Sequence, residues 1–124
     1  MISFDEFALL LDEVALDMPE EIYVRLNGGV NLLEDERVHP DSGQGAPLFV
    51  LGEYVVNSLG RYINVYYGSF MSTYSGVSLE RLKAEIEHTL KHEFLHHLED
   101  LAGERGLEVE DEVRLERYKK WFGV

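Results

Sequence analysis

The sequence contains no cysteine among its 124 residues. Disulfide bonds, thiolate zinc sites and a cysteine nucleophile are therefore excluded, and nitrogen and oxygen atoms must hold any bound metal. A chain without cysteine also suits a reducing compartment, so we expect a cytoplasmic protein. With 45% apolar residues, the chain is long enough to form a single domain over residues 1–124 that buries a core without cross-links.

Basic residues are scarce, because 11 Lys and Arg face 24 Asp and Glu and give a formal net charge of -13. Such a charge repels phosphate backbones and anionic lipids, so we expect no nucleic-acid partner and no membrane partner. The N-terminal stretch "MISFDEFALLLDEVALDMPEE" has no basic leader and interrupts its apolar residues with acidic ones. This stretch therefore predicts neither a signal peptide nor a membrane span. The negative net charge of the chain makes cationic groups the favoured partners.

The first half of the chain predicts two helices, a strand and a loop. Ser3 is a suitable N-cap for an amphipathic helix that Met18 and Pro19 end, and a short helix over 19–26 follows. "VNLLEDERVHP", residues 30–40, reads as a strand, and the glycine- and proline-rich stretch 40–47 reads as a surface loop.

The second half predicts a hairpin and two further helices, which makes the expected fold class α+β. Residues 48–56 and 61–70 are rich in β-branched and aromatic side chains, and the four residues "NSLG" between them suit an antiparallel turn. A long helix over 79–102 is bounded by Ser78 as N-cap and by Gly103, and a final helix covers about 109–122. An exposed strand edge near "RYINVYYGSF" could pair with an extended peptide.

The long helix carries "HEFLH", His92 to His96, which fits the HExxH pattern. At helical spacing the two imidazoles project about 40° apart and about 6 Å apart along the axis, so one cation can bridge them. They also point away from an apolar stripe formed by Leu79, Leu82, Ile86, Leu90, Phe94, Leu98 and Leu101. Glu93 projects beside them, where it could take a proton from metal-bound water. A solvated acidic helix face that happens to carry histidines is the alternative interpretation.

Together with the hairpin before it, "TLKHEFLHHLEDLAGERGLEVEDE" resembles a family of small bacterial metallopeptidase-like proteins with a minimal zincin fold. "LNGGVNLLEDERVHP" and "LGRYINVYYGSF" resemble the same family. The resemblance implies a small mixed or antiparallel sheet packed on the HExxH helix, His92 and His96 as Zn²⁺ ligands, and Glu93 as catalytic base. The family pattern continues with a histidine, then a glycine and an acidic residue, whereas this chain has His97 and then Glu99 in place of the glycine.

The third metal ligand has several candidates. Aligning "GLE" with the glycine and acidic residue of the family favours Glu108, because Gly103 and Gly106 allow the chain to turn back toward the histidines. Glu99 faces nearly the same way as His92 but lies about 10 Å further along a straight helix. The remaining alternatives are Glu110, Asp111 and water alone, which are left open here.

The other histidines have simpler interpretations. His97 falls on the apolar stripe, so we expect it to be buried and hydrogen-bonded to a backbone carbonyl rather than to hold the metal. His88 and His39 are expected to be exposed surface residues.

The sequence thus favours a zinc-dependent hydrolase of peptides or proteins. Two other functions stay open. One is a non-catalytic binding module on a zincin scaffold with a structural metal or none. The other is an interaction protein whose acidic surface captures a basic partner.

Overall fold

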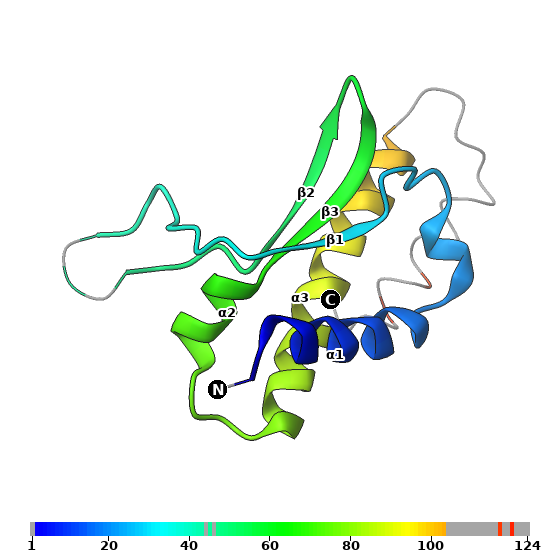
Figure 1. Ribbon diagram of the computed structural model, residues 1–124. Coiled ribbons are helices and arrows are strands. Elements are labelled where there is room, and N and C mark those ends of the chain that lie inside the picture. The colour runs from blue at the N-terminus through cyan, green and yellow to red at the C-terminus, as the bar shows by residue number, and fades with distance from the viewer. Residues whose placement is uncertain (1, 44, 46, 104–116, 118–119, 121–124) are drawn as a thin grey trace.

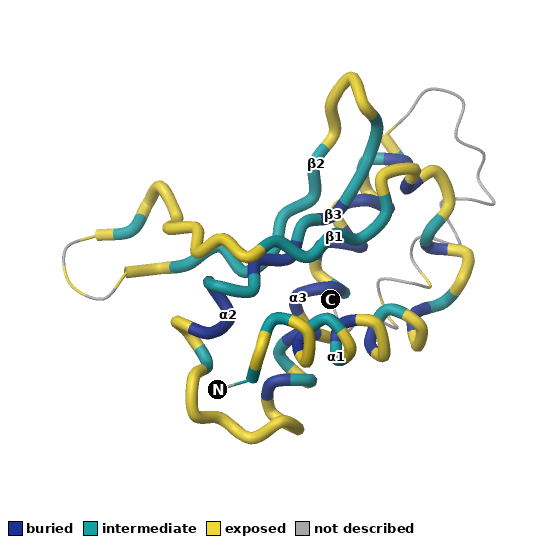
Figure 2. The backbone as a smooth tube through the Cα atoms, in the orientation of Figure 1, coloured by how far each residue is buried: buried dark blue, intermediate teal, exposed yellow. Residues whose placement is uncertain are grey.

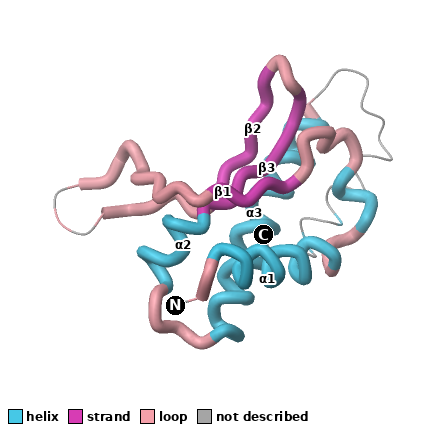
Figure 3. The backbone as a smooth tube through the Cα atoms, in the orientation of Figure 1, coloured by secondary structure: helices cyan, strands magenta, loops and turns pink. Residues whose placement is uncertain are grey.

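The computed structural model describes residues 2–43, 45, 47–103, 117 and 120 (Figure 1). Within those residues the chain forms three α-helices, one 3-10 helix and a three-stranded sheet (Figure 3). This arrangement confirms the predicted α+β class. The final helix expected at about 109–122 lies outside the described residues, apart from Arg117 and Lys120.

Helix α1, Phe4–Leu16, begins with the predicted cap. The Ser3 hydroxyl accepts a hydrogen bond from the Glu6 backbone N–H at 3.1 Å, and the Glu6 carboxylate accepts one from the Ser3 N–H at 3.1 Å. This reciprocal pair satisfies two backbone donors that a helix start leaves open. The short helix expected over 19–26 is a single 3-10 turn, η1, Glu20–Tyr23.

The sheet consists of β1 (Val30–Leu33), β2 (Gly52–Asn57) and β3 (Gly60–Tyr66), in the order β1-β3-β2. Strands β2 and β3 form the predicted antiparallel hairpin, and β1 pairs with β3 in parallel. The sheet is therefore mixed. Because β3 is the central strand, the expectation of an exposed edge near "RYINVYYGSF" was wrong, and β2 is the edge strand next to the HExxH helix.

Two strands are shorter than the sequence suggested. The strand expected over 30–40 ends at Leu33, and the one expected over 61–70 ends at Tyr66, where helix α2 (Tyr67–Tyr74) begins. The reason is a set of contacts between these two segments. The Glu34 carbonyl accepts a hydrogen bond from the Gly68 N–H at 3.2 Å, and the Arg37 N–H donates one to the Ser69 hydroxyl at 2.9 Å. The backbone after β1 therefore bonds to α2 rather than continuing the ladder.

Residues 34–51 leave the body of the protein and return to it, and we call this segment the arm (Figure 1). An antiparallel bridge between Val38 and Phe49 joins the two legs of the arm. The His39 N–H donates to the Leu48 carbonyl at 2.7 Å, and the Val50 N–H donates to the Arg37 carbonyl at 2.8 Å. The described residues of the predicted surface loop, 40–43, 45 and 47, lie in the outer part of this arm, beyond the bridge between its two legs.

Helix α3, Leu79–Ala102, has the predicted bounds, with Ser78 capping its start and Gly103 at its end. It packs against α1 and against β2 and β3, so it lies between the first helix and the sheet. Most of the predicted stripe is buried (Figure 2). Leu79 is 58% exposed, because the first turn of α3 extends beyond the core. The stripe contributes the following residues to the core: Leu82, Ile86, Leu90, Phe94 and Leu98.

Candidate metal and catalytic site

The two histidines of the HExxH pattern lie together on the exposed side of α3. Their Nε2 atoms are 3.0 Å apart, and their rings meet edge to face with centroids 4.5 Å apart. Partial burial lowers the pKa of His92, and the nearby charge of His96 lowers it further. The neutral imidazole, which is the form that binds metal, is thereby favoured at His92.

The spacing of this pair fits two ligands of one zinc ion. Two bonds of about 2.05 Å at a tetrahedral angle place their donor atoms about 3.3 Å apart, close to the distance between the two Nε2 atoms. Without a metal, the same distance makes a hydrogen bond between two neutral imidazoles. The donor set and its geometry therefore suit zinc, with further ligands needed to complete the shell.

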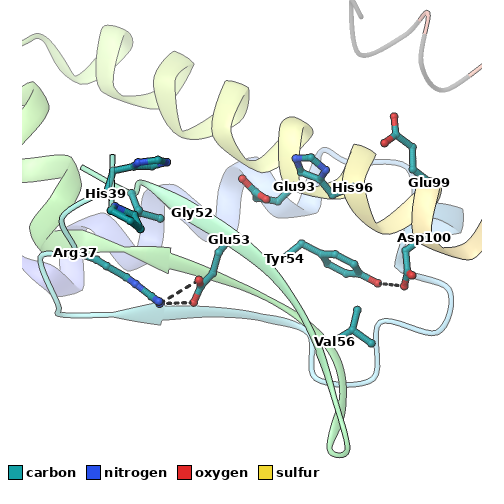
Figure 4. A pocket seen from close by; sticks show the side chains of 12 residues that line it. Arg37, His39, Gly52, Glu53, Tyr54, Val56, Glu93, His96, Glu99 and Asp100 are labelled. Atoms are coloured by element: carbon teal, nitrogen blue, oxygen red, sulfur yellow. Dashed lines mark hydrogen bonds and ion pairs between the residues drawn. The ribbon is translucent and has the colours of Figure 1, made fainter. Parts of the chain in front are cut away.

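The third ligand stays a prediction. Glu108, Glu110 and Asp111 lie outside the described residues. Among the residues that the structure does describe, no three His, Asp or Glu side chains form a group that could hold a metal, so Glu99 does not join the histidine pair in such a group. Glu99 is exposed at one end of the site (Figure 4).

Glu93 lies beside the histidines but is buried, with 7% of its surface exposed. It faces β2 at Gly52, where a Cβ atom would come within 3.4 Å of the Glu93 Cγ. Burial is the largest effect and raises the pKa of Glu93. The charge of His96 opposes it, the charge of Glu53 raises the pKa further, and the Tyr54 backbone N–H lowers it slightly. A carboxylate with a raised pKa holds a proton more readily, as a general base that must later return the proton requires.

A cleft of about 910 Å³ opens between α3, β2 and the base of the arm. Its lining includes Glu93 and His96 from α3, Glu53 and Tyr54 from β2, and Arg37 from the arm (Figure 4). This volume lies within the range of small-molecule and peptide sites. The candidate catalytic residues are therefore next to a space that a substrate could occupy.

The rear of the same helix turn is fixed by buried polar contacts. His97 is fully buried, and its Nε2 donates to the Val24 carbonyl at 2.8 Å, which confirms the predicted role. Its Nδ1 lies 2.8 Å from the Tyr54 phenol oxygen, which donates to Asp100 at 2.9 Å. Asp100 also accepts from Arg61 at 2.9 Å, and this bond lowers the pKa of its carboxyl group. Together these hydrogen bonds fix the orientation of α3 about its own axis.

A second polar group was not expected from the sequence. The Glu53 carboxylate accepts hydrogen bonds from Arg37, from Asn64 and from the Tyr66 hydroxyl. Arg37 and Glu53 are 16 positions apart, and only the course of the arm brings them together. The sequence pattern around either residue indicates an ordinary solvated strand position.

The remaining histidines agree with their predicted exposure. His88 is exposed one turn before His92. His39 is also exposed, at the start of the outer arm, although it lies on the lining of the cleft.

The chain is similar to a protein of known structure. No family model and no curated protein matches the chain. The solved structure of a conserved hypothetical protein from "Thermo thermophilus" matches with a TM-score of 0.69 and 31% identity, covering 82% of this chain and 98% of that chain. This chain belongs to the same family as that protein. That protein is described without an activity, so the match shows a shared fold and family. Any argument about function must come from the residues of the site.

No helix in the described part of the chain is both long and apolar enough to cross a membrane.

Proposed function

We propose that the protein is a zinc-dependent hydrolase with a minimal zincin-like fold that cleaves peptide bonds. One observation carries this proposal. The exposed imidazoles of His92 and His96 converge to 3.0 Å beside the buried carboxylate of Glu93, and His96 and Glu93 lie on the lining of a cleft. We assign His92, His96 and Glu108 as zinc ligands and Glu93 as the general base.

Zinc held by these ligands would polarise the scissile carbonyl and make a water molecule more acidic. Glu93 removes the proton from the attacking water and then passes it to the nitrogen of the leaving amine. Its position suits both steps, because the carboxylate is held between α3 and β2 and lies on the lining of the cleft. Its raised pKa brings the two protonation states closer in free energy at neutral pH.

Strand β2 supplies a place for an extended substrate. It pairs with β3 on one side, while Tyr54 directs its backbone N–H toward Glu93 on the other. An unpaired edge can bind a peptide through main-chain hydrogen bonds, with alternate side chains pointing into the cleft. A peptide bound along this edge would lie next to the general base.

The test combines metal content with one substitution. Protein purified without added metal should contain about one equivalent of zinc by elemental analysis, and zinc-loaded protein should hydrolyse a mixed peptide library followed by mass spectrometry. Glu93→Gln should keep the zinc and lose the hydrolysis, because the amide is nearly isosteric and cannot act as a base.

The outcomes separate the candidate functions. A protein that binds zinc but cleaves nothing would be a binding module on the same scaffold. A protein that neither carries zinc nor binds it on titration would contradict the hydrolase, and the acidic surface would become the leading feature. A Glu93→Gln variant with undiminished turnover would remove Glu93 from the mechanism.

A further inference from the structure

Arg37 is fixed in place although it lies in the arm. Its N–H donates to the hydroxyl of Ser69 at 2.9 Å, and its carbonyl accepts from the Val50 N–H at 2.8 Å. Ser69 is fully buried at the start of α2. The backbone of Arg37 is thus tied both to the body of the protein and to the opposite leg of the arm.

The side chain of Arg37 is also fixed by hydrogen bonds. Its Nη1 lies 2.9 Å and 3.0 Å from the two carboxylate oxygens of Glu53 and 2.8 Å from the Tyr66 hydroxyl. The guanidinium lies over the Tyr66 ring, 5.7 Å from its centroid. All these hydrogen bonds use Nη1, and within the described residues Nε and Nη2 have no acceptor. The side chain is 54% exposed on the lining of the cleft.

Arg37 brings a positive charge to the cleft of a chain whose formal net charge is -13. At the other end of the cleft the lining carries the carboxylates of Glu99 and Asp100 (Figure 4). A guanidinium with Nε and Nη2 available presents two parallel N–H donors, which match the two oxygens of a carboxylate. A fixed fork loses little conformational entropy on binding such a ligand.

The anchor is close to the general base. Arg37 bonds to Glu53, and Glu93 packs against Gly52, the neighbouring residue of β2. Arg37, Glu53 and Glu93 all lie on the lining of one cleft, so a carboxylate bound to Arg37 shares this space with the general base. A substrate held in this way has its anionic group near the scissile bond.

We propose that Arg37 binds the C-terminal carboxylate of the substrate, so that the enzyme removes short segments from the C-terminal ends of peptides. This inference rests on the proposed hydrolase activity and adds the class of substrate to it. An acidic side chain near the end of a peptide offers the same carboxylate chemistry, and the experiment separates the two sources.

The experiment uses three N-acetylated peptides of one otherwise neutral sequence, with the zinc-loaded protein. The first has a free C-terminal carboxylate, the second a C-terminal amide, and the third an amide with a glutamate as its last residue. Wild-type protein should prefer the first by about 10- to 100-fold in kcat/KM, mainly through KM, which is the range expected for hydrogen bonds to a charged group. Preference for the third peptide would assign the anchor to acidic side chains and overturn C-terminal recognition.

Arg37→Gln should remove the preference for the acid peptide over the amide peptide, whereas Arg37→Lys should restore part of it. Arg81 is a matched control, because it bonds to Glu85 at 2.9 Å, lies 5.8 Å from the Tyr74 ring centroid and is 58% exposed outside the cleft. Arg81→Gln should leave the preference intact. The double variant Arg37→Gln/Glu53→Gln removes both charges, and like Arg37→Gln it should show no preference for the acid peptide if lost recognition is the cause.

Failure of this inference is distinguishable from failure of the proposed function. Equal cleavage of the acid and amide peptides by wild-type protein would overturn the role of Arg37 and leave the hydrolase standing. If no peptide is cleaved, calorimetric titration with the acid and amide peptides decides the matter. Tighter binding of the acid peptide that Arg37→Gln abolishes supports the anchor, and equal binding refutes it.

Discussion

The close approach of β2 to α3 beneath Glu93 depends on Gly52 having no side chain. A Cβ atom at this position would lie 2.9 Å from the Thr89 Cγ2, 3.3 Å from the Asn64 carbonyl oxygen and 3.4 Å from the Glu93 Cγ. Ordinary contacts between carbon atoms are about 3.5–4.0 Å, so Gly52→Ala must push the strand and the helix apart. Because Thr89 is 7% exposed and β-branched on a helix, its methyl group has little freedom to move away.

The expected cost follows from these contacts. Overpacking costs about 1–3 kcal/mol, and replacing glycine by alanine returns about 0.4–1 kcal/mol through the unfolded chain, so Gly52→Ala should destabilise the protein by about 1–2 kcal/mol. A chain of 124 residues has an unfolding entropy of about 0.26 kcal/mol/K, which converts this loss into a fall in Tm of about 4–8 °C. Turnover should fall as well, since the strand is displaced from the general base.

The assay is thermal unfolding followed by far-ultraviolet circular dichroism and calorimetry. Gly43→Ala is the matched control, because a Cβ atom there meets nothing within 4 Å. Thr89→Ser removes the methyl group in closest contact, so the cost of Gly52→Ala should be about 1 kcal/mol smaller in that background. If Gly52→Ala unfolds at the same temperature as Gly43→Ala, the strand is not pressed against the helix and the reasoning fails.

The remaining predictions concern the metal and the general base. His92→Ala or His96→Ala should weaken zinc binding by orders of magnitude in calorimetric titration. Wild-type affinity should fall as pH drops from 8 to 5, because a protonated imidazole cannot bind metal. Flat affinity over this range would count against histidine ligation. Glu108→Ala should weaken zinc binding more than Glu99→Ala does, and the reverse result would assign the third ligand to α3. In metal-free protein the pKa of Glu93 is higher in the folded state than in the unfolded chain. Its contribution to the free energy of unfolding is therefore fully present at pH values below the pKa of the unfolded chain, and it is lost as the pH rises through the pKa of the folded state. Chemical denaturation should therefore find Glu93→Gln increasingly more stable than wild type as pH rises from about 4 to 8, and a constant difference would contradict the burial argument.

Local signals explain why much of α3 and its exposed histidine pair could be predicted. Ser78 and Gly103 mark the two ends of the helix, and its apolar residues recur at helical spacing. The same periodicity separates His96, which is exposed, from His97, which is buried and bonded to a carbonyl. One residue along a helix turns the side chain by about 100°, and this alone assigns the two neighbours to different environments.

Long-range contacts explain what could not be predicted. Tyr67 and Phe70 have strand propensity, yet they begin α2, because Gly68 packs against the backbone of Asp35 and Glu36. Such an approach has no local signature in the sequence. Arg37 joins the cleft for the same kind of reason: its position depends on Ser69, 32 residues away.

The contacts of His97 separate the stability of α3 from the chemistry of its exposed side. Val24 and Tyr54 hold the helix turn from behind, while His92 and His96 are exposed in front. Substitutions on the front therefore change ligands without changing what sets the helix rotation. The scaffold is suited to redesign: aspartate, cysteine or a non-natural chelating side chain can be exchanged at these two positions, and each new donor starts from a backbone whose orientation is already determined.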